Sequence, residues 1–258
     1  NKLDKLKALQ DSYGRELPQR IDALQVVCQQ LQHALEQPRM LQELHRLVHS
    51  LAGSAGTFGY TELSDQARRI ELDLTAWLQL RHVPAAGQLA ALAERIADLR
   101  QASLRAAPVQ AAAMTLYPVE ADDNRLVFVI EDDLLLGQEI QAQLAIYGWQ
   151  VEVFTALAQA RQALAHRRPA VLVVDIMLPE GASAGTDFMV ELNRQTAEPV
   201  PVIIMSARWD WPSRLGAARA GAQAYLTKPF GVGELQARVR ALLRRAAGRA
   251  APVIRHGE

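Results

Sequence analysis

Five polar residues stand at the ends of apolar segments in the second half of the chain, and their chemical types complement one another. They are Glu131, Asp132, Asp175, Ser206 and Lys228. Because ligands of an open α/β sheet bind beyond the carboxyl ends of its parallel strands, these side chains are predicted to meet in one site. Carboxylates hold a hard cation such as Mg²⁺, one carboxylate can attack phosphorus, and a hydroxyl and an ammonium can take up charge on the transferring oxygens. The residues therefore predict a site that accepts a phosphoryl group.

Each of these residues has an ordinary interpretation when it is taken alone. Glu131, Asp132 and Asp175 could be turn residues at strand ends, and Lys228 could be a solvated charge. A dehalogenase-type phosphatase also uses an aspartate at a strand end, but it needs a second carboxylate two residues later, where this chain has Met177. The order of all five residues after successive strands favours the phosphoryl-accepting site.

This arrangement resembles the receiver domain of two-component response regulators, over roughly half of the chain. The resemblance implies that Asp175 accepts the phosphoryl group and that Asp132 and Asp175 bind Mg²⁺ as the cofactor. It further implies that Glu131 assists them, directly or through water, and that the main-chain carbonyl of Met177 is another metal ligand.

The same resemblance assigns the remaining polar residues. Ser206 matches the hydroxyl that senses the phosphoryl group, and Lys228 matches the lysine of the site. Tyr225 matches the aromatic switch residue that turns inward on phosphorylation. Pro229 would follow a cis peptide bond, which X-Pro bonds adopt at small cost. The loop at 178–187 departs from the family pattern because it is roughly two residues longer than the common form.

A second candidate site surrounds His49 in the first hundred residues. Apolar residues at helical spacing form a stripe there: Leu44, Leu47, Val48, Leu51, Ala55 and Phe58. His49 falls off this stripe, and the residues on the following turns are tiny, so we expect the imidazole to be exposed and within reach of a partner. Glycine in a helix costs about 1 kcal/mol relative to alanine. Close approach of a protein that carries a phosphoaspartate would explain Gly53 and Gly56.

The segment resembles the histidine phosphotransfer (HPt) domain, through the run from His49 to Gly56 and Gly59 beyond it. The resemblance implies that His49 carries a phosphoryl group on nitrogen. The family commonly has lysine three residues after the histidine, whereas this chain has Ala52, which predicts slower transfer. Two other interpretations stay open. His49 could be a solvent-facing histidine without chemistry, or it could bind a metal with His45, itself expected to be a surface neighbour, although no third ligand completes a zinc motif.

The hydrophobic patterns predict two different folds along the chain. Leucines at three- and four-residue spacing predict helices at 15–37, 38–58, 61–80 and 85–106, and a short leading helix at 2–13. Strands are then expected at 126–130, 150–154, 171–174, 200–205 and 224–226, alternating with helices at 134–147, 156–166, 187–196, 212–220 and 233–246. The sequence therefore predicts an all-α four-helix bundle followed by a doubly wound, five-stranded parallel sheet of the flavodoxin-like type.

The domain boundaries follow from changes in composition. We expect the HPt-like bundle in residues 1–106, a linker in 107–124, the receiver domain in 125–247 and a tail in 248–258 that resembles the start of a removed output domain. The linker is indicated by Pro, Ala, Gln and acidic residues without periodicity. The last helix and its end are rich in arginine, which usually marks a solvated face but leaves a homodimer or output contact open.

The composition is that of an ordinary globular chain, with 258 residues, 28 basic and 28 acidic. Neutral charge gives no electrostatic case for nucleic acid binding by this chain alone. No apolar run is long enough to cross a bilayer, and the first residues lack a signal-like apolar region. The single cysteine, Cys28, cannot form an internal disulfide, which fits a reducing compartment. The sequence thus predicts a cytoplasmic location and no membrane role.

Together these features predict a two-component signalling protein and not a metabolic enzyme. Phosphoryl groups would pass between His49 and Asp175, or between each of these and external partners, namely a sensor histidine kinase and other receiver or HPt proteins. One alternative is the regulatory front half of a larger response regulator, with a diguanylate cyclase or winged-helix DNA-binding output after residue 258. Another is an interaction module that has lost its relay chemistry, for which Ala52 and the long loop are the only indications.

Overall fold

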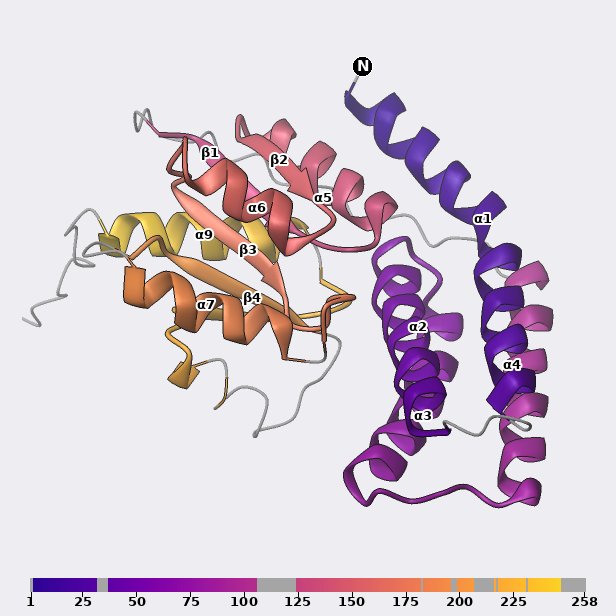
Figure 1. The fold of residues 1–258 in the computed structure, drawn as a ribbon. Helices are drawn as coiled ribbons and strands as arrows, with labels where there is room; N and C mark the ends of the chain where they lie inside the picture. The colour runs from indigo at the N-terminus through magenta and orange to yellow at the C-terminus, as the bar shows by residue number, and fades with distance from the viewer. Residues whose placement is uncertain are drawn as a thin grey trace, which may run out of the picture.

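The structure is a computed structural model that describes residues 2–31, 37–105, 124–181, 183–195, 199–206, 216, 218–230 and 232–246. Its first part consists of the helices α1 (Lys2–Leu31), α2 (Gln37–Thr57), α3 (Thr61–Gln79) and α4 (Ala86–Arg105). Each of these helices packs against two of the others, in the order α1, α2, α3, α4 and back to α1 (Figure 1). Apolar side chains from all four form one core, which confirms the predicted four-helix bundle.

Helix α1 differs from its prediction. The sequence predicted a short leading helix at 2–13 and a second helix from residue 15, but one helix of 30 residues runs through Gly14 and Pro18. Its buried residues recur every three or four positions: Tyr13, Leu17, Ile21, Leu24, Cys28 and Leu31. Because this stripe is continuous, its burial in the bundle outweighs the local cost of a glycine and a proline within the helix.

A tight turn joins α2 to α3. Gly59 has a φ of 86°, in the left-handed region that glycine adopts without strain. The main-chain N–H of Tyr60 donates to the carbonyl of Ala55 at 2.8 Å, which closes the end of α2. Phe58, the residue directly after α2, stacks on Tyr13 of α1 with the ring centroids 4.2 Å apart. These contacts fix α2 relative to both neighbouring helices.

The second part is a sheet of five parallel strands. The strands are β1 (Leu126–Ile130), β2 (Gln150–Phe154), β3 (Val171–Asp175), β4 (Val202–Ser206) and β5 (Ala224–Thr227), in the order β2-β1-β3-β4-β5. In the register, Val174 pairs with Ile130 on one side and Ile204 on the other, so β1, β3 and β4 end at the same edge. Asp175 and Ser206 are the last residues of their strands, one residue beyond the predicted ends.

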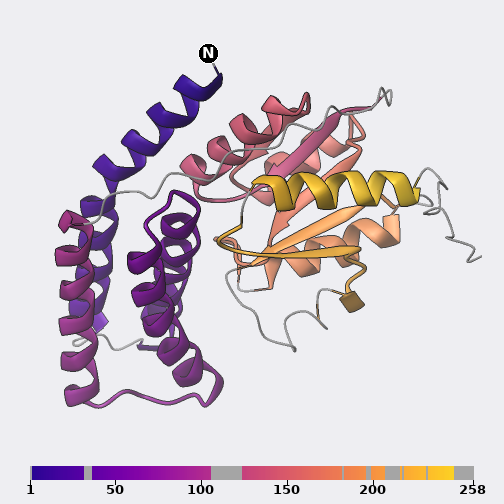
Figure 2. The same cartoon turned by 180° about the vertical axis from the view of Figure 1, so that it is seen from behind.

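Helices cover both faces of this sheet in the described part of the chain (Figure 2). They are α5 (Leu134–Ile146), α6 (Leu157–Leu164), α7 (Ala184–Gln195) and α9 (Val232–Ala246). Residues of α5 and α9 pack with Val127 and Val129 on one face, whereas residues of α6 and α7 pack with Phe128 and Ile130 on the other. This arrangement confirms the predicted doubly wound fold.

Three sequence predictions fall wholly or largely outside the described residues. These are the linker at 107–124, of which only the last residue is described, most of the helix at 212–220, and the tail at 248–258. Among the described helices, none is both long enough and apolar enough to cross a membrane.

The helical part and the sheet part touch along two helices. Helix α1 packs along α5, and both views show α2 beside the carboxyl ends of the strands (Figures 1 and 2). Leu135, at the start of α5, packs against the core of the helical bundle. The contact places α2 over the edge of the sheet at which β1, β3 and β4 end.

Candidate active site between the two domains

Three carboxylates meet at the carboxyl edge of the sheet. Glu131 and Asp132 follow β1 and Asp175 ends β3, and one oxygen of each lies within 4.8 Å of the others. Glu131 and Asp175 are buried, whereas Asp132 is partly exposed. The structure thus brings together the three acidic residues that the sequence predicted to meet, and carboxylate oxygens are the ligands that Mg²⁺ prefers.

The electrostatics of the cluster favour a bound cation. Burial raises the pKa of Glu131 well above its usual range; Lys228 opposes this shift, and the charges of Asp175 and Asp132 add to it. Burial also raises the pKa of Asp132, again with a contribution from Asp175. Repulsion among the carboxylates thus adds to the effect of burial in both shifts. A cation held among the carboxylates would lower both pKa values.

Lys228 is buried at the centre of this cluster. Its ammonium donates to Glu131 Oε2 at 2.5 Å and to Asp175 Oδ2 at 2.6 Å. Burial alone would lower the pKa of Lys228, but these two carboxylates outweigh burial and raise it. The peptide bond to Pro229 is cis, as the sequence predicted, and the Lys228 N–H donates to the carbonyl of Ser206 at 2.7 Å.

The other predicted site residues lie around this cluster in the positions of a strand-end site. Ser206 is buried at the end of β4, and the Met177 N–H donates to Asp175 Oδ1 at 3.2 Å. Tyr225 on β5 is half-buried and packs with the apolar cluster on the face covered by α6 and α7. Its predicted role as a switch stays a prediction.

His49 lies directly opposite these carboxylates, on α2. Its Nδ1 is 2.7 Å from Glu71 Oε1 on α3, and its Nε2 is 4.0 Å from Asp175 Oδ1. The predicted exposure of His49 is wrong for this arrangement, because the residue is 2% exposed. The residues that cover His49 include Asp175, which belongs to the acidic cluster of the other domain. His49 is therefore covered at the contact between the two domains and faces the predicted acceptor.

The two glycines after His49 lie where the domains approach most closely. A Cβ atom added to Gly53 would be 2.8 Å from Cδ of Lys228, and one added to Gly56 would be 2.5 Å from Cγ of Pro229. The close approach that these glycines predicted is thus present. The surface that approaches them belongs to the same chain.

Two neighbours of His49 differ from expectation. Ala52 is completely buried in the core of the bundle, so its position does not offer a side chain to the acidic cluster. A lysine of the other domain, Lys228, lies against the neighbouring Gly53. His45 was expected at the surface, but it is buried, and its Nε2 lies 2.8 Å from Thr75 Oγ1. This hydrogen bond occupies Nε2 of His45, so that this nitrogen is not available to bind a metal together with His49.

Four charged residues of the helical domain were missed in the sequence. Glu71 contacts His49, and three arginines contact the other domain: Arg20 through Asp133, Arg46 through Asp132 and Arg68 through the main-chain carbonyl of Lys228. Each pair is separated by 22 or more residues in sequence. Taken alone, each of these residues has the pattern of a charge on a solvated helix face. Only the packing of α3 on α2 and of the helices on the sheet makes these contacts predictable.

A cavity opens beside the His49–Asp175 pair. It has a volume of about 1040 Å³ and extends between α2, α3 and the loop after β3. Its lining includes Arg46 and His49 from one domain and Met177 and Ser206 from the other. The cavity therefore gives small molecules a path to the side of His49 while the domains are in contact.

Comparisons with known families divide the chain at the same place as the fold. Residues 15–115 match the family model described as Hpt domain, and residues 127–240 match the model described as response regulator receiver domain. Both are families of signalling modules.

Individual relatives match about half of the chain. The response regulator protein PmrA of Pseudomonas aeruginosa is 44% identical over 132 residues, which are 51% of this chain and 58% of that protein. The KDP operon transcriptional regulatory protein KdpE of Escherichia coli is 37% identical over 126 residues, or 49% of this chain and 54% of that protein. The chain thus spans a little over half the length of these curated relatives. A solved Francisella response regulator receiver domain is 30% identical and covers 48% of this chain and 99% of its own, with a TM-score of 0.44.

Proposed function

We propose that this chain, an Hpt domain joined to a response regulator receiver domain and built for His–Asp phosphorelay signalling, passes a phosphoryl group within itself between His49 and Asp175. The observation that carries the proposal is the 4.0 Å distance between His49 Nε2 and Asp175 Oδ1 in a buried contact. In a near-attack arrangement an attacking atom lies about 3–3.5 Å from the atom that it attacks. A single phosphorus between these two nucleophiles is within reach of both after a small separation of the domains.

The contact with Glu71 prepares His49 as a nucleophile. A carboxylate only accepts hydrogen bonds, so Nδ1 of His49 must carry the proton that is shared with Glu71 Oε1 at 2.7 Å. The lone pair of the neutral ring is then on Nε2. This atom is buried and has no hydrogen-bond partner in the described part of the chain, so it is free to attack phosphorus.

The transfer step balances within these residues. As the Nε2–phosphorus bond forms on His49, the bond between phosphorus and the carboxylate oxygen of Asp175 breaks, and Asp175 regains its carboxylate. The proton stays on Nδ1, where the negative charge of Glu71 stabilises the positive ring. The reverse step phosphorylates Asp175 at the expense of His49. The ammonium of Lys228, which already touches Asp175, compensates charge on the phosphoryl oxygens, together with the hydroxyl of Ser206.

Mg²⁺ fits the acidic cluster and is part of the proposal. Glu131, Asp132 and Asp175, with the main-chain carbonyl of Met177, would hold it, because they offer hard oxygen ligands and the carboxylates repel one another. Bound there, the ion would neutralise negative charge on the phosphoryl group.

External partners must reach the same residues. We propose a sensor histidine kinase, and other receiver or HPt proteins, as partners of a relay in the cytoplasm, where a free buried thiol such as that of Cys28 persists. His49 and Asp175 are 2% and 1% exposed, so exchange with another protein requires the two domains to separate. The two domains would act as signalling modules.

Chemical stability of the label distinguishes the two phosphorylated residues. The wild-type protein, incubated with radiolabelled acetyl phosphate and Mg²⁺, should acquire both an acyl phosphate and a base-stable, acid-labile phosphohistidine. Asp175→Asn should lose both labels, and His49→Gln should lose only the phosphohistidine. Base-stable label in the His49→Gln protein, or its full retention in the Asp175→Asn protein, would contradict the proposal.

A further inference from the structure

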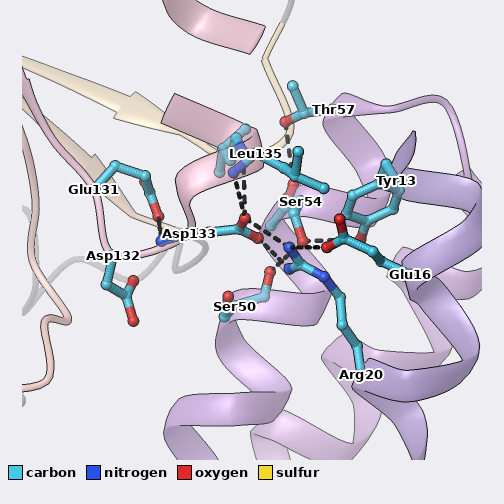
Figure 3. A network of polar contacts seen from close by, with 12 residues as sticks. Tyr13, Glu16, Arg20, Ser50, Ser54, Thr57, Glu131, Asp132, Asp133 and Leu135 are labelled. Atoms are coloured by element: carbon cyan, nitrogen blue, oxygen red, sulfur yellow. Dashed lines mark hydrogen bonds and ion pairs between the residues drawn. The ribbon is translucent and has the colours of Figure 1, made fainter. Parts of the chain in front are cut away.

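A buried ion pair joins α1 of the helical domain to the start of α5 in the receiver domain (Figure 3). The guanidinium of Arg20 donates to both carboxylate oxygens of Asp133, with Nη2 at 2.9 Å from Oδ1 and Nη1 hydrogen-bonded to Oδ2. The side chain of Asp133 is 1% exposed and that of Arg20 is 25% exposed. In the described part of the chain, neither residue forms a hydrogen bond or an ion pair with His49 or Asp175, so the pair is separate from the reacting atoms.

Asp133 has a second function that does not depend on Arg20. It is the N-cap of α5, where its Oδ1 accepts the N–H groups of Leu135 at 3.1 Å and Leu136 at 3.3 Å. The same carboxylate thus holds the start of α5 through Oδ1 and accepts the guanidinium of Arg20 through both oxygens.

Arg20 is held in position by its own domain before it meets Asp133. Its guanidinium lies 5.1 Å from the centre of the Tyr13 ring, and Glu16 lies 3.7 Å away on the same helix. The Tyr13 hydroxyl is 2.8 Å from Ser54 Oγ on α2, the helix that carries His49 (Figure 3). Tyr13 thus links the orientation of Arg20 to α2, and a bidentate pair transmits orientation as well as attraction.

We propose that the Arg20–Asp133 pair is the recognition contact by which the Hpt domain docks on the receiver of its own chain, and that Arg20 is a positioning residue for transfer. A receiver that lacks a carboxylate at this place would bury Arg20 without a partner, which disfavours it. The docking role stands on the contact alone, whereas the positioning role rests on the proposed transfer between His49 and Asp175.

Substitution of Arg20 separates docking from folding. Arg20 is outside the buried core of the bundle, and the cap of α5 is complete without it. Arg15→Glu is a matched control, because Arg15 is exposed on the same helix and the substitution changes the charge by the same amount. Asp133→Asn keeps an oxygen for the cap and removes the charge.

Small-angle X-ray scattering of the full chain tests docking without phosphate chemistry. In a His49→Gln background, Arg20→Glu should lengthen the maximum dimension, whereas Arg15→Glu should leave it unchanged. Asp133→Asn should give an intermediate result, and Arg20→Lys, which cannot form the bidentate pair, should restore docking only partly. Identical scattering from the Arg20→Glu and Arg15→Glu proteins would overturn the proposal.

Transfer kinetics test the positioning role in the full chain with His49 present. Arg20→Glu should slow the appearance of phosphohistidine from phosphorylated Asp175 by roughly 10- to 100-fold, the range expected for loss of charge-assisted hydrogen bonds. Arg15→Glu should transfer at the wild-type rate. Equal rates in the two variants would overturn the positioning role. Domain opening in Arg20→Glu, with no phosphohistidine in any variant or in the wild type, would support the docking contact and contradict the proposed function instead.

Discussion

At the scale of single residues, the site depends on the pairing of His49 with Glu71 as much as on the acidic cluster. One ring nitrogen is bound at 2.7 Å by the carboxylate of Glu71 and the other faces Asp175. The sequence predicted the nucleophile and the acceptor but not the residue that orients the nucleophile. Because the tautomer of a neutral histidine is set by the hydrogen bond of its other nitrogen, Glu71 would leave Nε2 as the attacking atom in the proposed transfer.

Substitution of Glu71 should therefore change transfer more than stability. Glu71→Gln keeps an acceptor for Nδ1–H but loses the negative charge, so we expect phosphohistidine formation to slow about tenfold, and Glu71→Ala to slow it further. Nitrogen NMR of His49 should show the Nδ1–H tautomer in the wild type and a mixture in Glu71→Ala. Unchanged transfer rates and an unchanged tautomer in Glu71→Ala would contradict the orienting role.

At the scale of elements, the close approach of α2 to the receiver depends on Gly53. An alanine there would strengthen the helix by about 1 kcal/mol, but its Cβ would lie 2.8 Å from Lys228 Cδ, so docking should weaken. We expect Gly53→Ala to raise the thermal stability of the helical domain and to slow transfer about tenfold, since small displacements of reacting groups are costly. Stopped-flow or quench measurements of transfer check this.

Gly87→Ala provides the control for that experiment. Gly87 is the second residue of α4, and nothing lies within 4 Å of a Cβ added there, so this substitution should leave transfer unchanged. If Gly53→Ala transfers as fast as Gly87→Ala, the close approach of α2 does not limit the reaction.

Helix α5 carries a buried carboxyl that should make the stability of the receiver domain depend on pH. Burial raises the pKa of Glu139 from 4.5 to about 7, although the hydrogen bond from Gln143 lowers it in part. The folded state then favours the neutral carboxyl. The contribution of Glu139 to the free energy of unfolding is therefore fully present below about pH 4.5 and is lost as the pH rises through 7. Glu139→Gln should raise the unfolding free energy at pH 8 by roughly 1–3 kcal/mol.

Chemical denaturation of both proteins at several pH values measures this effect. The stability difference between Glu139→Gln and the wild type should grow from pH 5 to pH 8. A difference that is constant across this range would show that the carboxyl of Glu139 does not titrate with folding in that range.

The elements show which features the sequence could predict. The five strands and the residues at their ends follow from local patterns, because an apolar run that ends in a carboxylate or a hydroxyl can be recognised within ten residues of sequence. The continuous helix α1 was missed, because its buried stripe crosses Gly14 and Pro18, where local propensity indicates a break. The contacts of Glu71 and Arg20 were missed because they exist only after separate elements pack together.

At the scale of the whole molecule, one contact both brings the two residues of the proposed transfer together and covers them. His49 is covered by the receiver domain, and Asp175 is buried beneath α2. The sequence predicted two sites, each open to partners, and no local pattern could place one on the other. Among the described residues, the contact includes Arg20, Arg46 and Arg68, the small residues of α2, and the packing of α1 on α5.

A comparison of transfer within one chain and between chains tests this account most directly. The wild-type protein and an equimolar mixture of His49→Gln with Asp175→Asn are each incubated with acetyl phosphate and Mg²⁺ over a wide range of protein concentrations. In the mixture, phosphate must pass from Asp175 of one chain to His49 of another. The account predicts that phosphohistidine forms in the wild type at a rate independent of concentration, and in the mixture more slowly and in proportion to concentration. Equal rates in the two samples, both rising with concentration, would contradict transfer within the chain.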